Sequence, residues 1–274
     1  MSTALPAQAA AVAAAALPVP AMPPDVDRLR AALHALNLDR SSDALVGLLN
    51  DAVRDDHAPA SFLQRLLTIE IQGREESRIK TSLKLSGLPL GQTLTNFDFA
   101  FQPSIERGKI ETLATCQWVR DQQCVLLLGP PGVGKTHLAI ALGVAAVERG
   151  CSVSFFRVEQ LLHLLRQDAR ISPTELKRRK YMSASLLILD EVGFEPFSRE
   201  DANLFFRLVS YRYQRGAILI TSNKTIREWP DMLAGDEVIA AAILDRLLHA
   251  SHVLHIAGRS YRLRDLESAM RSRT

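Results

Sequence analysis

Residues 129–136 read Gly-Pro-Pro-Gly-Val-Gly-Lys-Thr and follow the apolar run 125–128 without a gap. This stretch meets the G-x-x-x-x-G-K-T pattern, in which glycines let backbone N–H groups turn toward phosphate oxygens. The pattern requires a strand before the loop and a helix after it, and the sequence predicts both. The helix adds the positive end of its dipole to the anion site. The stretch therefore predicts a nucleotide-binding domain of the α/β class.

Each polar residue of this loop has an expected contact with the nucleotide, which we take to be ATP. Lys135 is expected to reach the β- and γ-phosphates, and the Thr136 hydroxyl to ligate Mg²⁺. His137 closes the segment in the first helical turn, where its ring is expected to be packed or solvated. The expected nucleotide-binding residues are Gly129, Pro130, Pro131, Gly132, Val133, Gly134, Lys135, Thr136 and His137.

A second acidic motif follows about fifty residues later, where the run Leu-Leu-Ile-Leu at 186–189 ends in Asp190 and Glu191. An apolar strand that ends in two carboxylates completes a site of this kind. Asp190 is expected to hold Mg²⁺ through water, and Glu191 to polarise the attacking water. Because transfer to a small molecule needs no water-activating glutamate, Glu191 favours hydrolysis of ATP to ADP and phosphate.

A polar residue also follows the predicted strand 217–221, which continues into Ser222 and Asn223. We expect Asn223 to contact the γ-phosphate or to orient the attacking water. The alternative is that Asn223 only forms the turn, because asparagine is common at such positions.

Strands and helices alternate through the second half of the chain. Strands are predicted at 125–128, 153–156, 186–189 and 217–221, with helices at 135–149, near 158–168 and at 199–214 between them. This rhythm predicts a mostly parallel sheet that helices cover on both faces.

The first part of the chain has apolar residues at helical spacing over 25–72, with helix starts expected at Ser42-Asp43 and at Pro59-Ala60-Ser61. Residues 73–95 are expected to begin as helix and end as a connector. Residues 25–95 are therefore predicted to form a small all-helical domain with its connector. Residues 1–24 are rich in Ala and Pro and precede the first basic residue, Arg28, so we expect a disordered leader and no signal peptide.

Composition excludes several classes of protein. Hydrophobic residues make up 47% of the chain and charged residues 23%, as in ordinary globular proteins. No apolar stretch is long enough to cross a membrane. The three cysteines form no C-x-x-C pair, which argues against a disulfide framework or a zinc site. We expect a cytoplasmic protein in a reducing compartment.

The net charge is only +3, but basic residues gather in two segments, 157–181 and 259–274. Such segments suit a polyanion such as double-stranded DNA, bound largely without regard to sequence, because phosphate contacts carry no base information. The alternative is a pair of solvated helical faces. His249, His252 and His255 recur every third residue, but 252–256 alternates like a strand, so no metal site is expected there.

Five stretches together resemble a known family: Asn-Phe-Asp-Phe at 96–99, GPPGVGKTHLA at 129–139, LLILDEVGF at 186–194, ITSN at 220–223 and ILDRLLH at 243–249. Over residues 97–257 the chain resembles the AAA+ ATPases of the IstB/DnaC-like group, which are insertion-sequence transposition helpers and replicative helicase loaders. The resemblance implies a P-loop NTPase fold over 96–258, a homo-oligomer that forms with ATP, binding to DNA, and a transposase as partner.

The resemblance also implies roles for single residues. Lys135, Glu191, Asn223 and Arg246 are implied to be catalytic, with Arg246 as the arginine finger offered to the neighbouring subunit. The alternative for Arg246 is a helix-surface arginine paired with Asp245 or another nearby carboxylate. Only 28 residues follow Arg246, so no C-terminal lid domain is expected and 259–274 is taken as a basic tail. Either Arg259 or Arg262 could replace the sensor 2 arginine of the missing lid.

Three alternative functions remain open at this level. A helicase loader of the DnaC type would share every motif and differ only in its partner. A small-molecule phosphotransferase would need an acceptor site that the sequence does not show. A scaffold gated by ATP would bind the nucleotide and scarcely hydrolyse it.

Overall fold

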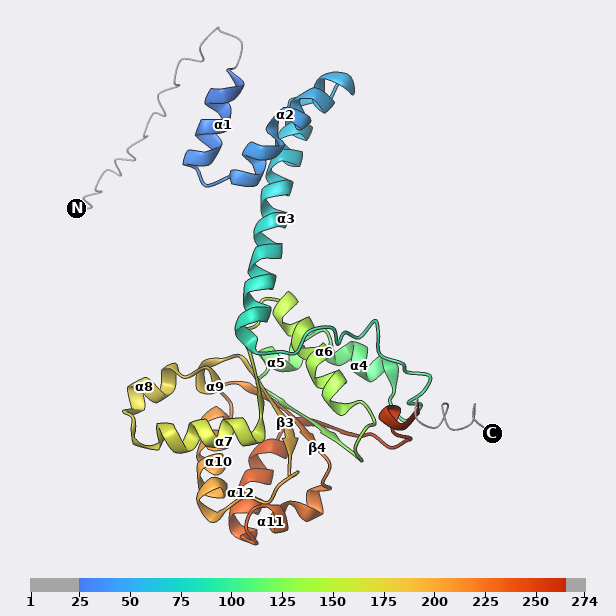
Figure 1. Cartoon of the computed structure of the whole chain (residues 1–274), viewed down its shortest axis with the longest axis vertical. Helices are drawn as coiled ribbons and strands as arrows, with labels where there is room; N and C mark the ends of the chain where they lie inside the picture. The colour runs from blue at the N-terminus through green and yellow to red at the C-terminus, as the bar shows by residue number, and fades with distance from the viewer. Residues whose placement is uncertain (1–24, 265–274) are drawn as a thin grey trace, which may run out of the picture. The chain divides into compact units, whose positions relative to one another are not determined.

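The computed structural model describes residues 25–264, which divide into two compact units between Glu75 and Glu76. The first unit contains α1 (Val26–Ala35), α2 (Asp39–Arg54) and the first part of α3 (Pro59–Ser86). The second unit begins within α3 and contains every later element (Figure 1). The connector up to residue 95 therefore groups with the second unit. The expected leader and the last ten residues of the expected basic tail lie outside the described residues.

The first unit packs its helices around Leu45, Leu48 and Leu66, which are all buried. The helix start expected at Ser42-Asp43 was wrong, because α2 begins at Asp39. The buried carboxylate of Glu70, on α3, accepts hydrogen bonds from the backbone N–H groups of Arg40 and Ser41. This distant carboxylate satisfies the free donors of the first turn, which a sequence search for a local cap cannot find. The start of α3 at Pro59 was predicted correctly.

Several apolar residues of this unit lie on its surface. Leu36, Val53 and Leu63 follow the helical spacing that predicted a core, yet each is more than half exposed. The apolar periodicity therefore predicted the helices correctly. It did not predict which apolar residues are buried, since the buried face of each helix is narrower than its apolar face.

The second unit is built on one parallel sheet with the strand order β2-β3-β4-β1-β5. This confirms the predicted parallel sheet flanked by helices. The elements of the second unit, in chain order, are α4 (Arg107–Leu113), α5 (Gln117–Arg120), β1 (Cys124–Leu128), α6 (Lys135–Glu148), β2 (Val153–Arg157), α7 (Val158–Gln167), η1 (Asp168–Arg170), α8 (Pro173–Arg178), α9 (Lys180–Ser183), β3 (Leu186–Val192), α10 (Arg199–Arg212), β4 (Ala217–Ser222), η2 (Ile226–Glu228), α11 (Trp229–Met232), α12 (Glu237–Leu248) and β5 (Ser251–His255).

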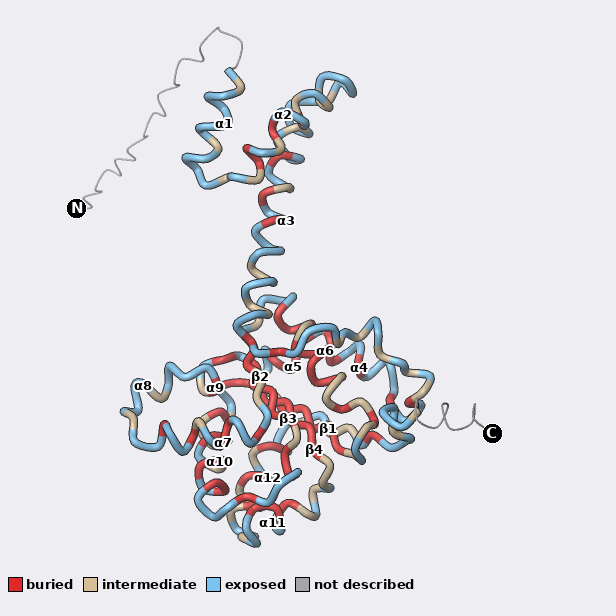
Figure 2. The backbone as a smooth tube through the Cα atoms, in the orientation of Figure 1, coloured by how far each residue is buried: buried red, intermediate tan, exposed pale blue. Residues whose placement is uncertain are grey.

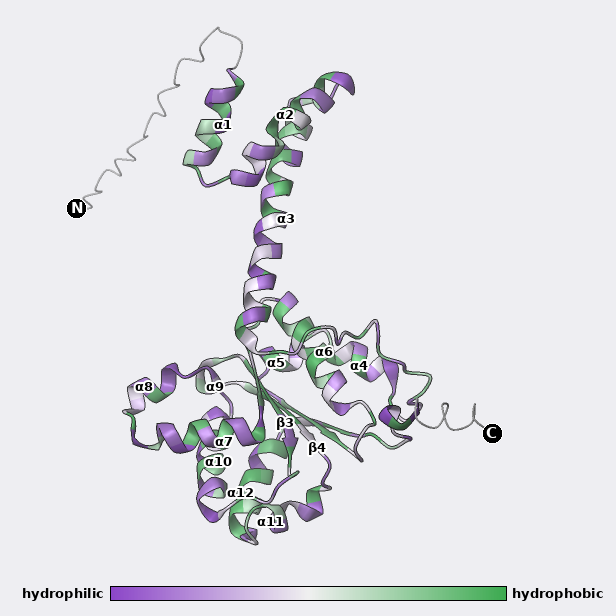
Figure 3. Ribbon diagram, viewed as in Figure 1, coloured by the Kyte–Doolittle hydropathy of each residue, from purple (hydrophilic) through white to green (hydrophobic). Residues whose placement is uncertain are grey.

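Helices cover both faces of this sheet. Leu126 and Leu128 of β1 face one core with α7, α10 and α12, whereas Val125 and Leu127 face the other core with α4, α5 and α6. β1 and the first four residues of β3 and of β4 are continuous apolar runs, as expected for strands that are buried on both faces (Figure 2). Hydrophobic colour also dominates α6 and α12, which pack on opposite faces of the sheet (Figure 3).

The structure extends β3 furthest beyond its predicted bounds and adds short helices that the sequence did not predict. Strand β3 continues to Val192, three residues past the predicted end at 189, and includes a register shift between Leu189 and Val192. The helices α8 and α9 carry no clear apolar period, because each is shorter than two turns. In the described part of the chain, no helix has the length and apolar character needed to cross a membrane.

A buried arginine joins the starts of two strands. Arg212 is only 1% exposed, and its guanidinium donates to the carbonyls of Tyr181, Met182, Ala184 and Ala217 at 2.8–3.2 Å. Burial lowers the pKa of this guanidinium to about 10. Four carbonyl dipoles replace the water that the buried cation has lost.

We predict that Arg212→Met lowers the free energy of unfolding by more than about 3 kcal/mol, since each buried carbonyl left without a donor costs about 1–3 kcal/mol. Methionine keeps much of the apolar stem, so the loss reports the hydrogen bonds. Urea unfolding would measure it. The exposed Arg215→Met change serves as control and should shift stability by no more than about 0.5 kcal/mol. Equal stability of the two variants would show that the carbonyls find other donors.

Candidate functional site

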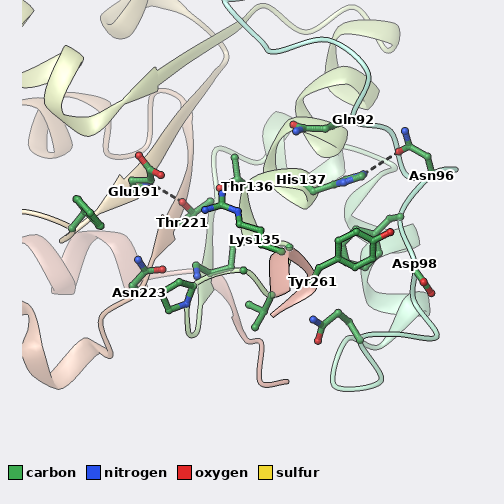
Figure 4. A pocket seen from close by; sticks show the side chains of 18 residues that line it. Gln92, Asn96, Asp98, Lys135, Thr136, His137, Glu191, Thr221, Asn223 and Tyr261 are labelled. Atoms are coloured by element: carbon green, nitrogen blue, oxygen red, sulfur yellow. Dashed lines mark hydrogen bonds between the residues drawn. The ribbon is translucent and has the colours of Figure 1, made fainter. Parts of the chain in front are cut away.

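The candidate site lies at the carboxyl ends of β1, β3 and β4, where the two predicted motifs meet. A cavity of about 380 Å³ opens there. Figure 4 shows Lys135, Thr136, Glu191 and Asn223 around it. The residues that line the cavity are Gln92, Asn96, Phe97, Asp98, Gln102, Pro131, Gly132, Val133, Gly134, Lys135, Thr136, His137, Glu191, Phe194, Thr221, Asn223, Tyr261 and Arg262.

The loop between β1 and α6 holds its shape through a glycine that no other residue could replace without strain. Gly134 has φ of 95° at the N-cap of α6, and a Cβ atom there would lie 2.7 Å from the Phe97 ring. Its left-handed backbone places the first N–H groups of α6 at the cavity, which is the arrangement that binds phosphate.

Lys135 is buried and bonded to its own loop. It is 6% exposed, and its Nζ donates to the carbonyls of Gly129 and Pro130, each at 2.7 Å. Burial lowers the pKa of Lys135 to about 8, although the nearby Asp190 carboxylate opposes this shift. Gly129 and Pro130 were expected to contact the nucleotide. Neither is among the residues that line the cavity, and their carbonyls accept hydrogen bonds from Lys135.

One carboxylate oxygen connects the two predicted motifs. Asp190 Oδ1 accepts from Thr136 Oγ1 at 2.9 Å and from Thr221 Oγ1 at 2.5 Å. The Thr221 oxygen in turn accepts from the backbone N–H of Glu191 at 3.0 Å. Thr221 was not among the predicted site residues, although it immediately precedes Ser222-Asn223 on β4.

The residues beside Thr136 fit a magnesium ion. The Thr136 hydroxyl and the Asp190 carboxylate are oxygen donors within hydrogen-bond distance of each other, and Mg²⁺ prefers oxygen ligands and keeps several waters. In residues 25–264 no group of three His, Cys, Asp or Glu side chains is arranged to hold a metal. His249 ends α12, and His252 and His255 lie on β5.

Glu191 has an unusual backbone. Its φ is 63°, at the register shift that bends β3 next to β4. A non-glycine residue in this region is uncommon and is found at sites where the side chain must point in a set direction. The Glu191 side chain is 42% exposed, and its carboxylate lies 3.8 Å from Arg157 Nε. It lines the cavity together with Asn223.

A segment before α4 covers the other side of the cavity. The His137 Nε2 atom lies 2.9 Å from the Thr93 carbonyl and 3.0 Å from Asn96 Oδ1 (Figure 4). The Phe97 ring packs edge-on against the His137 ring. His137 therefore holds this segment beside the cavity, as a packed residue. Of the residues that this segment contributes to the cavity, the sequence analysis singled out only the stretch Asn-Phe-Asp-Phe at 96–99.

The chain after β5 returns to the phosphate loop. The Tyr261 N–H donates to the Gly132 carbonyl at 2.9 Å, and Arg262 lines the cavity next to it. Of the two arginines considered as sensor 2, Arg262 is thus at the cavity. The Arg259 carbonyl accepts from Gln102 Nε2 at 2.7 Å. Arg259 is not among the residues that line the cavity.

Arg246 lies at the opposite edge of the sheet from its own phosphate loop. It shares a small cavity with Cys124 and Gly216, which stand at the starts of β1 and β4. Its guanidinium donates to the Ala242 carbonyl at 2.6 Å and lies 5.0 Å from the centre of the Phe206 ring. The structure thus pairs Arg246 with an aromatic ring and not with Asp245.

The predicted basic segment 157–181 is partly neutralised. Arg166 pairs with Asp201 and Arg179 with Asp168, at 2.7 and 2.6 Å. Lys180 Nζ donates to the Leu85 carbonyl. Arg170, Lys177 and Arg178 are exposed cations of this segment that make neither an ion pair nor a side-chain hydrogen bond with a described residue.

Comparison with known proteins places the chain in a family. The model of the IstB-like ATP-binding protein family matches residues 31–269. An ATP-binding protein of insertion sequence IS21 from Pseudomonas aeruginosa is 43% identical, over 88% of this chain and 91% of the relative. The ATP-binding protein of insertion sequence IS5376 from Geobacillus stearothermophilus is 36% identical, over 87% of this chain and 95% of the relative.

Among solved structures, the DnaC helicase loader matches with a TM-score of 0.46 and 23% identity, over 54% of this chain and 86% of that chain. The family match and the two relatives confirm the resemblance that the motifs indicated. The chain belongs to the family of IstB-like ATP-binding proteins, AAA+ proteins with a phosphate-binding loop.

Proposed function

We propose that this protein is an ATP-hydrolysing AAA+ regulator that assembles on DNA and assists a transposase. The observation that carries the proposal is the division of the catalytic residues between two edges of the sheet. Lys135, Glu191 and Asn223 surround one cavity, while Arg246 lies at the far edge. Arg246 can therefore reach a γ-phosphate only in the cavity of a second copy.

Each residue at the cavity has a defined part in hydrolysis. Lys135 exchanges its two loop carbonyls for phosphate oxygens, which restores solvation to a buried ammonium. Thr136 and, through water, Asp190 would hold Mg²⁺, which would neutralise charge on the phosphates. Glu191 polarises a water for attack, and Asn223 orients it. Arg262 adds a second cation from the same chain.

The neighbouring subunit supplies the remaining cation. Arg246 rests on Phe206 and on a carbonyl of its own helix, so both contacts can be exchanged for a phosphate. A guanidinium at the γ-phosphate stabilises the charge that develops in the transition state. ATP would then hold two copies together and be hydrolysed at their junction.

Insertion-sequence relatives favour transposition over helicase loading, because the names of the two relatives reported above refer to insertion sequences. A small-molecule phosphotransferase would have no use for a Glu191 placed at the cavity. A scaffold that binds ATP without hydrolysis keeps the same residues, and a phosphate-release assay distinguishes it. We propose cytoplasmic double-stranded DNA as the partner of Arg170, Lys177 and Arg178.

We predict that Glu191→Gln binds ATP and loses hydrolysis by about 10²–10⁴-fold, the usual contribution of a general base. The amide keeps the side-chain shape and cannot accept the proton from water. Phosphate release and nucleotide titration would measure the two effects separately. Glu200→Gln, an exposed carboxylate on α10, serves as control. Full activity of Glu191→Gln would assign Glu191 a structural role.

We predict that Arg246→Ala binds ATP and hydrolyses it poorly, by analogy with arginine fingers worth about 10³–10⁵ in rate. Mixing it with Lys135→Ala, which cannot bind ATP, should restore part of the activity. ATP held by the Arg246→Ala chain then meets Arg246 of the Lys135→Ala chain. The Lys135→Ala/Arg246→Ala double variant should give no rescue. Mixtures that co-assemble and stay inactive at every ratio would exclude a role in trans.

We predict that replacing Arg170, Lys177 and Arg178 together with Ala weakens binding to unrelated duplexes equally. The slope of log K against log salt should become shallower by about 0.9 for each phosphate that the variant no longer neutralises. Replacing Arg120, Arg199 and Arg227, which removes the same charge elsewhere on the second unit, is the control. If both triple variants keep the parental affinity and slope, DNA binds another surface.

A further inference from the structure

An exposed aromatic residue stands at the rim of the nucleotide cavity. Phe194 is 73% exposed, and it lines the cavity beside Glu191. An exposed phenylalanine gains nothing from folding, because its ring stays in water. Phe194 is also not needed for the core, which the neighbouring Phe197 enters instead.

The turn that carries Phe194 is held at both ends. Gly193 has φ of 87°, and a Cβ atom there would lie 2.5 Å from Met232 Sδ. Phe197 is buried, and its N–H donates to the Met232 carbonyl at 2.8 Å. The Phe194 ring is therefore presented to solvent on a fixed backbone, so binding it to a partner costs little ordering entropy.

An apolar groove lies beside Arg246 on another face of the same unit. Its volume is about 340 Å³, and Leu176, Met182, Leu204, Phe206 and Tyr211 are among its lining residues. Phe206 lines the groove and also carries the Arg246 guanidinium on its ring. The hydroxyl of Ser210, another lining residue, is buried and has no hydrogen-bond partner among the described residues.

The residue that follows Phe194 and one residue of the groove wall carry opposite charges. Glu195 follows Phe194 and is exposed, and Arg207 is exposed on the wall of the groove. Neither side chain makes an ion pair with a described residue. A contact that brings Phe194 to the groove would bring an acidic side chain to a basic one.

We infer that Phe194 of one copy inserts into the apolar groove beside Arg246 of the next copy, with Glu195 placed near Arg207. This inference rests on the proposed function, which requires Arg246 of a neighbour to reach the cavity that Glu191 and Phe194 line. Because Arg246 and the groove share Phe206, moving Arg246 to the γ-phosphate moves the groove toward Phe194. The contact is head to tail, since each copy offers different surfaces on its two sides.

Assembly with a non-hydrolysable ATP analogue, followed by sedimentation velocity, tests the contact. Phe194→Ser should raise the concentration needed for half-assembly by about ten- to a hundredfold, the equivalent of burying one phenylalanine ring. Titration with a fluorescent ATP analogue, at concentrations where the chain is unassembled, checks that nucleotide still binds. Leu90→Ser, which removes an 84% exposed leucine, is the matched control and should assemble like the parent.

A charge exchange identifies the partner surface. Glu195→Arg and Arg207→Glu should each weaken assembly, and the two changes in one chain should restore it. Glu195→Arg combined with Arg227→Glu should give no restoration, since Arg227 is exposed and does not line the groove.

The outcomes separate this inference from the proposed function. Normal assembly of Phe194→Ser, with rescue between Arg246→Ala and Lys135→Ala intact, would overturn the inference alone. Loss of DNA binding by Phe194→Ser with assembly unchanged would also overturn it, because the ring then contacts DNA. A parental chain that never assembles with the analogue would overturn both.

Discussion

Asp190 Oδ1 accepts hydrogen bonds from Thr136 on α6 and from Thr221 on β4, and the arrangement of the site depends on this single oxygen. The phosphate loop, the acidic motif and the strand that precedes Asn223 come from distant parts of the chain. Parallel strands bring their carboxyl ends to one edge, but they do not set side-chain positions there. The two short hydrogen bonds to the buried Asp190 carboxylate fix these side-chain positions. The Thr221 oxygen also accepts from the Glu191 N–H, so it fixes the Glu191 backbone as well.

Two cations are buried in the part of the second unit that the structure describes, and neither has a carboxylate within hydrogen-bond distance. Arg212 is surrounded by four carbonyls at the starts of strands, and Lys135 by two carbonyls of its own loop. The two sites differ in whether another hydrogen-bond acceptor can reach the cation. Arg212 is only 1% exposed, so the four carbonyls remain its partners. Lys135 itself lines a cavity, so a polyanion that enters the cavity can replace its two carbonyls. Backbone carbonyls thus solvate a buried cation at both edges of the sheet. Those around Arg212 stay bound, whereas those around Lys135 can be replaced by phosphate oxygens.

The sequence predicted the parts of the fold that depend on local pattern. Apolar runs located β1 to β4, and the glycines with Lys135 located the phosphate loop. It did not predict Thr221, Gln92 or Tyr261 at the cavity, because their positions depend on how irregular segments pack against α6 and the loop. It also misplaced the start of α2, since Glu70 caps that helix from another helix. Contacts between distant segments leave no periodic signal.

Because Arg246 lies far from its own phosphate loop, the number of complete ATP sites in a head-to-tail assembly depends on whether the assembly is closed. A closed ring has as many complete junctions as subunits, whereas an open row always has one fewer. In an open row, the cavity at one end would hold ATP and lack a finger. Turnover per chain would therefore rise with the length of the row, and the terminal subunit would retain its nucleotide longest. The retained nucleotide would mark one end of the row, so the row would acquire a direction from the placement of one arginine.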